Sequence, residues 1–578
     1  MQIQEDAGQS RGMDLLRPFR SRLGTTAGKP PATTSRFIND LDTPLLRVNS
    51  EGDALRVRDF FEGIFAFGAT GSGKSSGVGI ALLMAMMGVG WGGLILCAKP
   101  GEAERCIRAA QQCGRGDDVI IMRPGSGRHF NFIEHEMRRA DGLGADVFNL
   151  VSLMMVMVEA MRVALNQAQE EGGFWISAMR ELLANAIEPL IAATGRFRLD
   201  ELMQFITTAP NRPEDMHDPE WCARSYWYWA MDQAHDAPRG PPMSEASRRA
   251  VQDYWLGNFI RLDPKTRSNV VATLTATISP FLRGHLHEMF CTDTTVVPEL
   301  THEGAIIIVD CPIKTMGING VMAALVMKYC WQRSIEARLV GPHTRPGFLY
   351  VDESQLFKLA YDLEFQGTAR SALAATVYLT QNLSNYYATQ PGRDPKAATD
   401  ALLGNFQTKI FHTNTDVATN QYAADLIGKG IVRRASGNWS ENGGWSRGEN
   451  DGTTYSYQRG KNKGRQSGSQ SGGGVTYSDT GSASYSINSG GSHGRQEGES
   501  SSWSRGQTTG TSRGESGGWN SGGGWSEQMD YLVPPSFFAS GLRKGGPEND
   551  FLVDGVLVQG GRRFRASGGH SLFVTFQQ

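Results

Sequence analysis

A glycine-rich stretch between residues 68 and 75 has the residue types and spacing that hold phosphate. It reads GATGSGKS and fits the pattern G-x-x-x-x-G-K-[ST] in full. Glycines let the backbone curl so that successive N–H groups face an anion, and the helix that follows adds the positive end of its dipole. Lys74 would reach the β- and γ-phosphates, and the Ser75 hydroxyl would bind Mg²⁺. The candidate nucleotide-binding residues are Gly68, Thr70, Gly71, Ser72, Gly73, Lys74, Ser75 and Ser76.

Two adjacent acids follow an apolar run later in the chain, in the sequence GFLYVDES. Residues 348–351 predict a buried strand that delivers Asp352 and Glu353 to its tip. Asp352 would hold Mg²⁺ through water, and Glu353 would act on the water that attacks the γ-phosphate. A strand that ends in two acids is weak evidence alone. Together with a complete phosphate-binding loop it predicts ATP hydrolysis, with Lys74 and Glu353 as catalytic residues.

Two further polar residues are candidates for the same chemistry. An apolar strand over residues 375–379 ends at Thr380 and Gln381, and Gln381 is the candidate sensor of the γ-phosphate. The alternative is a polar pair that merely ends a strand. Arg370, in GTARSA, is a candidate arginine finger for the ATP of a neighbouring subunit, and a solvated surface arginine is the alternative.

The elements that must position these residues follow from the hydrophobic pattern. Strand and helix signals alternate over residues 46–135 and resume after residue 304, as in a parallel sheet covered by helices. Between about 143 and 286, apolar residues recur at three- and four-residue spacing, which predicts an inserted all-helical domain. Aromatic residues in SYWYWAMD could stack nucleic-acid bases, although core packing of helices is the simpler interpretation.

A low-complexity segment occupies residues 434–527, where Gly, Ser, Thr and Asn alternate with spaced Trp and Tyr. Its few aliphatic side chains predict a flexible linker, with weak partner binding and glycine-rich hairpins as alternatives. We therefore divide the chain into an irregular arm, a discontinuous ATPase domain, the all-α domain, the flexible segment and a C-terminal segment. Their bounds are 1–45, 46–140 with 287–433, 141–286, 434–527 and 528–578.

Composition excludes several other classes of protein. A formal net charge of −2 over 578 residues gives no bulk field for coating nucleic acid. Seven scattered cysteines form no C-x-x-C pair, so neither a disulfide framework nor a zinc site is expected. The apolar run over residues 77–98 is long enough to cross a bilayer. Its central glycines favour a buried helix, a turn and a strand instead.

These motifs, in this order, resemble the conjugative coupling ATPases of type IV secretion, which belong to the FtsK/HerA group of hexameric motors. The likeness rests on GATGSGKSS, on KPGE at residues 99–102, on LYVDES, on ARSA and on TQN. It continues in KTRSNVVATLTATISPFL, in TKIFHTNTDVATNQYAADLIGK and in the tail beginning DYLVPPSFF. It spans roughly residues 50–430 and 528–566.

The resemblance implies a RecA-like α/β P-loop domain with an all-α domain, a ring of six subunits, and ATP with Mg²⁺ bound between subunits. It also implies that Glu353 is the catalytic carboxylate, that an arginine such as Arg370 acts in trans, and that DNA passes through the ring. A relaxase or secretion-channel proteins would be partners. Typical coupling proteins begin with transmembrane helices, and the first 60 residues here contain none.

We therefore expect a cytoplasmic ATPase, with membrane contact only through a partner and a peripheral position at the inner membrane face left open. The expected function is ATP-driven DNA translocation into a secretion channel. One alternative is a soluble HerA-like motor in DNA processing or defence. The other is an ATP-gated platform that sorts protein substrates, against which the intact pair Asp352 and Glu353 argues, because a platform needs no catalytic acid.

Overall fold

The computed structural model describes residues 36–139, 146–164, 172–390, 394–440, 456–458, 470–477, 483–490, 504–506 and 520–578. The chain divides into two compact units. The first comprises residues 1–421 and 536–578, and the second comprises residues 422–535. The candidate chemistry lies in the first unit.

Within the described residues, nine strands form the main sheet of the first unit, in the order β17-β16-β9-β3-β8-β7-β4-β6-β5. The seven strands from β9 to β5 are parallel to their neighbours, whereas β16 and β17 run antiparallel. The strands are β3 (Ile64–Phe67), β4 (Gly92–Leu96), β5 (Val119–Met122), β6 (Ile306–Val309), β7 (Gly347–Val351), β8 (Ala374–Thr380), β9 (Thr408–Phe411), β16 (Leu552–Gln559) and β17 (Ser571–Gln577).

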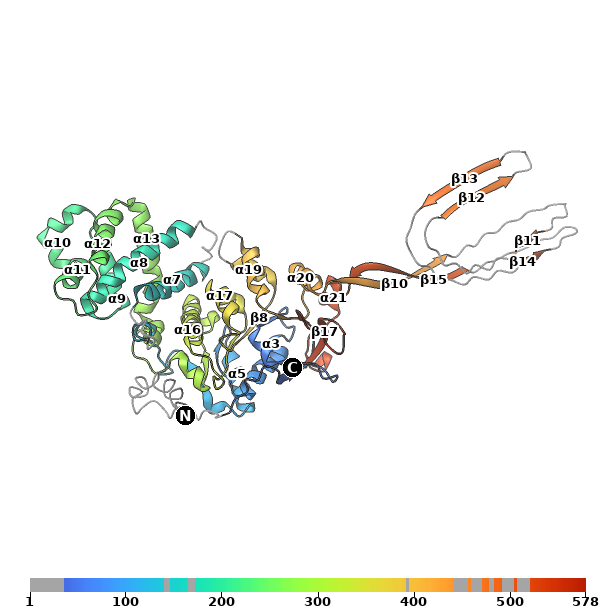
Figure 1. Cartoon of the computed structure of the whole chain (residues 1–578), viewed down its shortest axis with the longest axis horizontal. Helices are drawn as coiled ribbons and strands as arrows, with labels where there is room; N and C mark the ends of the chain where they lie inside the picture. The colour runs from blue at the N-terminus through green and yellow to red at the C-terminus, as the bar shows by residue number, and fades with distance from the viewer. Residues whose placement is uncertain are drawn as a thin grey trace, which may run out of the picture. The chain divides into compact units, whose positions relative to one another are not determined.

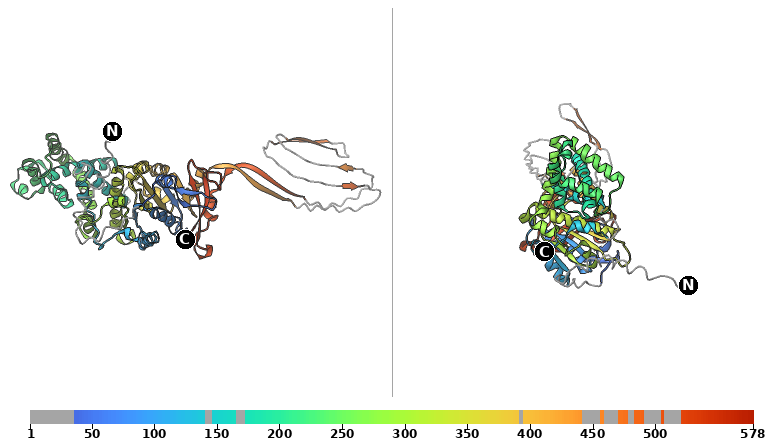
Figure 2. Two further views of the ribbon diagram at one scale, coloured as in Figure 1. Left: turned by 60° about the horizontal axis from the view of Figure 1, so that its bottom comes forward. Right: turned by 90° about the vertical axis from the view of Figure 1, so that its left-hand side faces the viewer.

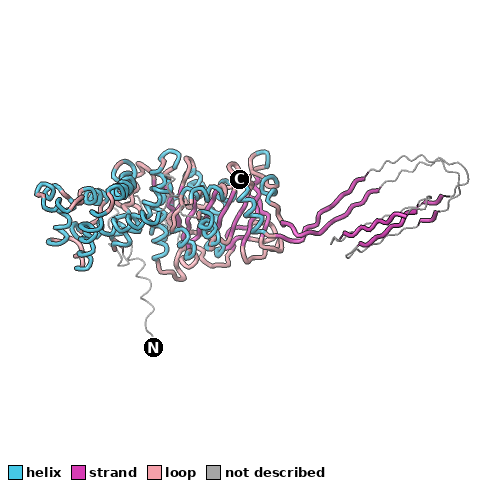
Figure 3. Tube along the Cα trace, turned by 90° about the horizontal axis from the view of Figure 1, so that it is seen from above, coloured by secondary structure: helices cyan, strands magenta, loops and turns pink. Residues whose placement is uncertain are grey.

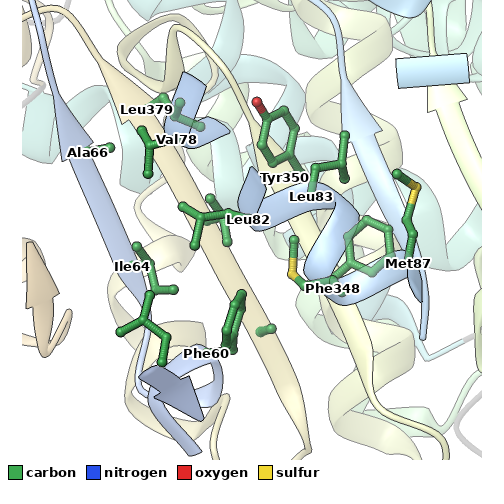
Figure 4. Close-up of a cluster of buried hydrophobic side chains, with 14 of the residues drawn as sticks. Phe60, Ile64, Ala66, Val78, Leu82, Leu83, Met87, Phe348, Tyr350 and Leu379 are labelled. Carbon is green, nitrogen blue, oxygen red and sulfur yellow. The ribbon is translucent and has the colours of Figure 1, made fainter. Parts of the chain in front are cut away.

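The central strands are continuous apolar runs because both faces of the sheet are covered, as parallel sheets require. On one face, Ile64 and Ala66 of β3 pack with Tyr350 of β7 and with Leu82 and Leu83 of α4 (Ile80–Gly88) (Figure 4). Alternate residues point to the opposite face, where the rings of Phe65 of β3 and Tyr378 of β8 lie 6.1 Å apart.

Helices lie on both sides of the strands in Figure 3. The opposite face is covered by α16, whose Lys328 ammonium lies 5.1 Å from the ring centroid of Tyr378. This is the RecA-like α/β organisation that the sequence predicts. The helices outside residues 147–290 are α3 (Val57–Phe61), α4, α5 (Glu102–Gln112), α6 (Phe132–Met137), α15 (Ile313–Met316), α16 (Ile318–Ala337), α17 (Tyr361–Thr368), α18 (Leu383–Thr389), α19 (Pro395–Gly404), α20 (Val417–Ile427) and α21 (Pro535–Ser540).

Every regular element described between residues 147 and 290 is helical. These helices gather in one cluster, coloured teal to green in Figures 1 and 2, and α7 packs against α16. Within SYWYWAMD, Trp227 is buried in this cluster, as helical core packing predicts, whereas Trp229 is 37% exposed. The helices are α7 (Val147–Ala164), α8 (Gly172–Thr194), α9 (Leu199–Thr207), α10 (Pro219–Arg224), α11 (Tyr226–Asp236), α12 (Glu245–Asp253), α13 (Pro264–Ile278) and α14 (Gly284–Phe290).

The apolar run over residues 77–98 folds as the sequence predicts, into the end of a helix, a turn and strand β4. Its helix differs in one detail, because η1 (Ser75–Gly79), directly after the phosphate-binding loop, is a π-helical turn. Gly79 lets this turn approach the sheet, since a Cβ there would lie 2.7 Å from the Tyr350 hydroxyl. No described helix combines the length and the apolar character needed to cross a membrane.

The second unit contains paired antiparallel strands. β10 (Lys429–Ser440) pairs with β15 (Asn520–Tyr531) over twelve positions, and β12 (Gln470–Tyr477) pairs with β13 (Ala483–Gly490). The shorter strands β11 (Ser456–Gln458) and β14 (Ser504–Gly506) also pair with each other. These antiparallel pairs are compatible with the hairpin alternative for this segment, and the flexible linker stays a prediction. Near the start of the first unit, β1 (Pro44–Arg47) pairs with β2 (Ala54–Arg56).

Candidate nucleotide-binding and hydrolysis site

The predicted site residues converge because parallel strands end at the same edge of a sheet. The phosphate-binding loop follows β3, Lys99 comes shortly after β4, Asp352 follows β7, and Gln381 follows β8. Ligands of open α/β sheets bind outside this carboxyl edge. β8 lies between the strand that carries the loop and the strand that carries the acids.

The loop itself has the shape of an anion cradle. Gly71 and Gly73 have φ angles of 75° and 80°, which glycine adopts most readily. The Ser72 amide donates to the Ala69 carbonyl at 3.0 Å, which closes the turn. The Ser72 hydroxyl is buried and has no hydrogen-bond partner among the described residues. A buried donor facing this cradle fits a bound phosphate, because native proteins seldom leave such a group unpaired.

Lys74 and Asp352 form a buried ion pair at the centre of the site. The Lys74 ammonium donates to Asp352 Oδ1 at 2.7 Å, and both side chains are almost fully buried. Burial alone would raise the pKa of Asp352. The charge of Lys74 and hydrogen bonds from Lys74 and Ser75 outweigh burial and lower the pKa. An ionised carboxylate beside the Ser75 hydroxyl fits Mg²⁺, which takes few protein ligands and completes its shell with phosphates and water.

Glu353 is held in one conformation from several directions. Its backbone is left-handed (φ 51°), which is uncommon for a non-glycine residue and clusters at functional sites. Gln355 Nε2 donates to one carboxylate oxygen at 2.7 Å, and Gln381 Nε2 lies 3.4 Å from the other. The Lys99 ammonium also contacts this second oxygen. Burial would raise the pKa of Glu353, but Lys74, Lys99 and Gln355 lower it, so the residue is an ionised carboxylate.

A hydrogen-bond network anchors the loop that follows Glu353. Thr380 donates to the Gln355 side chain at 2.7 Å, which links this loop to β8. The Tyr386 hydroxyl donates to Ser354 Oγ at 2.7 Å, and the Lys358 ammonium donates to the Tyr386 carbonyl at 3.0 Å. The network fixes the two acids relative to the neighbouring strand. It therefore supplies the preorganisation that a hydrolytic carboxylate needs.

Glu102 fixes the turn that carries Lys99. Its carboxylate accepts hydrogen bonds from the amides of Ala98 (2.9 Å) and Lys99 (3.2 Å). Burial and the nearby Asp352 charge raise the pKa of Glu102 to about 7. In the motif KPGE, the glutamate therefore stabilises the turn and the lysine contacts Glu353.

The C-terminal part of the chain also borders the site. A Cβ placed on Gly73 would lie 2.3 Å from Val553 Cγ2, so β16 packs directly against the phosphate-binding loop. The Gln578 side chain donates to Ser76 Oγ at 2.8 Å. Thr413, after β9, accepts a hydrogen bond at 3.0 Å from the amide of Ala69. The loop is therefore held by segments that lie more than 300 residues away in the sequence.

Arg370 stands apart from this cluster. Its guanidinium pairs with Glu62 at 3.1 Å, and its side chain is 60% exposed. It precedes the start of β8, at the amino edge of the sheet. The seven residues of β8 separate that edge from Gln381 by about 20 Å. Arg370 therefore cannot reach the nucleotide site of its own subunit, and its proposed role in trans stays a prediction.

The structure thus brings together Lys74, Ser75, Asp352, Glu353 and Gln381, all of which are named from the sequence as site residues. Lys99, Glu102 and Gln355 also contribute and were not predicted as site residues. The sequence contained a signal for Lys99. It follows a wholly buried parallel strand, and residues at that end of such a strand lie at the ligand-binding edge of the sheet. Nothing local in the sequence points to Val553 or Gln578.

No family model and no curated protein matches the sequence. Among solved structures, the chain is similar to "Plasmid coupling protein TrwB in complex with ADP and Mg2+", at 16% identity and a TM-score of 0.46, over 68% of this chain and 80% of that one. It is also similar to "Structure of VirB4 of Thermoanaerobacter pseudethanolicus", at 13% identity and a TM-score of 0.40, over 67% of this chain and 89% of that one. These values are too low to transfer the neighbours' ligands or partners to this chain.

Proposed function

We propose that this chain is an oligomeric, DNA-dependent ATPase. The observation that carries ATP hydrolysis is the buried arrangement of Lys74 with Asp352, and of Glu353 beside it, at the carboxyl edge of a parallel sheet. Lys74 and Ser75 would bind the phosphates and Mg²⁺. Glu353, ionised and rigidly held, would orient and deprotonate the attacking water.

The proposed work of hydrolysis is translocation of DNA, or of DNA with an attached relaxase, through a ring of six subunits into a type IV secretion channel. The ordered motifs from GATGSGKSS to TQN support this proposal, because they resemble those of conjugative coupling ATPases. The same resemblance supports ATP binding between subunits, with Arg370 acting on the ATP of a neighbouring subunit; its exposed side chain is accessible to such a neighbour.

The test is ATP turnover by the purified protein with and without single- and double-stranded DNA, beside Glu353→Gln. We expect DNA to stimulate turnover several-fold. Because the variant keeps Lys74 and Ser75 but lacks the carboxylate, it should bind ATP and turn over at least about 100-fold more slowly. Glu364→Gln removes an exposed carboxylate of α17 and is the matched control.

Turnover that ignores DNA would refute the motor and favour the protein-sorting platform. If Glu353→Gln retained full turnover, the assignment of Glu353 as the catalytic carboxylate would be wrong. Stimulation by DNA would leave the pathway to be settled, since a motor in DNA processing or defence would respond in the same way.

A further inference from the structure

Lys99 reaches the catalytic carboxylate from the solvent side of the site. Its ammonium contacts Glu353 Oε1, yet its side chain remains 48% exposed whereas that of Glu353 is 4% exposed. A half-exposed lysine on a four-carbon stem can change partner at little cost. The carboxylate cannot follow it, because Glu353 is fixed by its left-handed backbone and by Gln355.

The backbone of Lys99, in contrast to its side chain, is held by hydrogen bonds. Glu102 accepts hydrogen bonds from the amides of Ala98 and Lys99, so the turn after β4 is locked. The half-exposed side chain of Lys99 can therefore change partner without a change in the backbone of this turn, within a radius set by its own length. The Lys99 ammonium reaches Glu353, and it can also reach a phosphate group that binds next to Glu353.

Two cations and two carboxylates therefore alternate at the site. Lys74 pairs with Asp352, and Lys99 pairs with Glu353. The two pairs lie side by side, because Asp352 and Glu353 are consecutive in the chain. The terminal phosphate of a nucleotide held by Lys74, with Mg²⁺ on Asp352, would thus lie next to Lys99.

We propose that Lys99 binds the γ-phosphate of ATP, and that it holds Glu353 only until a triphosphate arrives. This inference rests on the proposed ATPase function and adds a residue to it. The γ-phosphate carries more charge than one carboxylate and competes for the ammonium. Once Lys99 moves to the phosphate, one oxygen of Glu353 loses a donor and is free to accept a hydrogen bond from the attacking water.

The consequence is that Lys99 distinguishes ATP from ADP. A charge-assisted hydrogen bond to the γ-phosphate would strengthen triphosphate binding, and ADP lacks the group that Lys99 contacts. In the transition state the same ammonium would stabilise the charge on the phosphoryl oxygens. A lysine that only positioned Glu353 would affect turnover without affecting this discrimination.

The test measures nucleotide binding in a background that cannot hydrolyse ATP. Glu353→Gln and the double variant Glu353→Gln with Lys99→Met are titrated with Mg-ATP and Mg-ADP. Removing both charges avoids leaving Glu353 buried without its cation. We expect Lys99→Met to raise the Kd for ATP about tenfold or more and to leave the Kd for ADP within twofold.

Two further variants complete the design. Lys99→Arg keeps the cation and should restore most of the ATP preference in the same background. Arg108→Met removes an exposed charge from α5, the helix that begins at Glu102, and should change neither Kd. In the otherwise wild-type protein, Lys99→Met should lower kcat about 100-fold, as expected when one donor to a developing charge is lost.

Equal changes in the Kd for ATP and ADP would overturn the proposal, and so would no change in either. A loss of kcat with unchanged ATP preference would show that Lys99 positions Glu353 only. Failure of the ATPase proposal is separate, because it appears as absent turnover in the wild-type protein, whereas the binding titrations need no turnover.

Discussion

At the residue scale, the site depends on charges that are buried together. Asp352 stays ionised beside Lys74 although burial opposes it, and Glu353 stays ionised beside Lys99 and Gln355. Removing one partner of such a pair costs more than the pair contributes, because the remaining charge is left without compensation. Substitutions in this cluster are therefore best made as charge-matched pairs.

Lys358 offers a test of the electrostatics of the loop behind Glu353. Burial lowers the pKa of its ammonium from 10.5 to about 7. Between these values the unfolded chain holds a proton that the folded chain has lost, so the energetic cost of burying Lys358 falls and the free energy of unfolding rises as pH rises. Relative to Lys358→Met, we expect the wild-type free energy of unfolding to increase by about 2 kcal/mol from pH 7 to pH 9.

Urea unfolding at the two pH values measures this difference, with Lys396→Met as an exposed control whose pH profile should parallel that of the wild type. If Lys358→Met also ran parallel to the wild type, Lys358 would have an ordinary pKa and the loop would be more hydrated than its burial indicates.

At the element scale, the main sheet of the first unit carries the nucleotide site, and the paired strands β10 to β15 of the second unit contribute no residue to it. Every residue assigned here to the nucleotide site lies on β3, β4, β7, β8, β9 or β16, on the loops and helices next to them, or at Gln578 after β17. None of these residues lies between Ser440 and Asn520. The register pairs Ser440 with Asn520, so the two strands could be joined there directly.

Replacing residues 441–519 by the two-residue turn Asn-Gly should therefore preserve ATP turnover within about twofold, because this turn matches the twist of an antiparallel pair. Turnover with and without DNA measures the outcome, and a pull-down of secretion partners measures what the segment does. If basal turnover were lost while the circular dichroism of the protein stayed unchanged, the segment would be required for the ATPase itself.

At the scale of the whole molecule, the position of Arg370 bears on whether copies of the chain assemble with ATP bound between them. Arg370 lies at the amino edge of the sheet, about 20 Å from the nucleotide site of its own chain. If it acts on ATP, it must therefore act on the ATP of another copy. A subunit without Lys74 would still lend its Arg370, and a subunit without Arg370 would still bind ATP.

We therefore expect Arg370→Ala and Lys74→Ala to be inactive alone and to regain turnover when mixed. Random mixing in a ring leaves about a quarter of the neighbouring pairs with an intact site, so recovery should approach that fraction of wild-type activity. Size-exclusion chromatography of each variant verifies that the assembly is retained. If the mixtures remained inactive, Arg370 would be a surface residue that pairs with Glu62 and has no role in catalysis.

The sequence by itself determined the local chemistry and the strands that carry it. GATGSGKS specifies a phosphate cradle because glycine positions and a lysine act over a few residues. The apolar runs before Asp352 and Gln381 specify buried parallel strands. A strand with apolar side chains on both faces is stable only where protein covers both faces of the sheet. Convergence at one edge follows from parallel pairing, so Lys74, Asp352, Glu353 and Gln381 could be grouped without coordinates.

Only the tertiary structure decided which distant segments complete the site. The contact between Lys99 and Glu353 joins residues 254 positions apart, and Ser76 is bonded to Gln578. Contacts of this kind leave no periodic or spacing signal, because they depend on strand order and on loop packing. For the same reason the sequence could name Arg370 but could not place it at the opposite edge from its own nucleotide site.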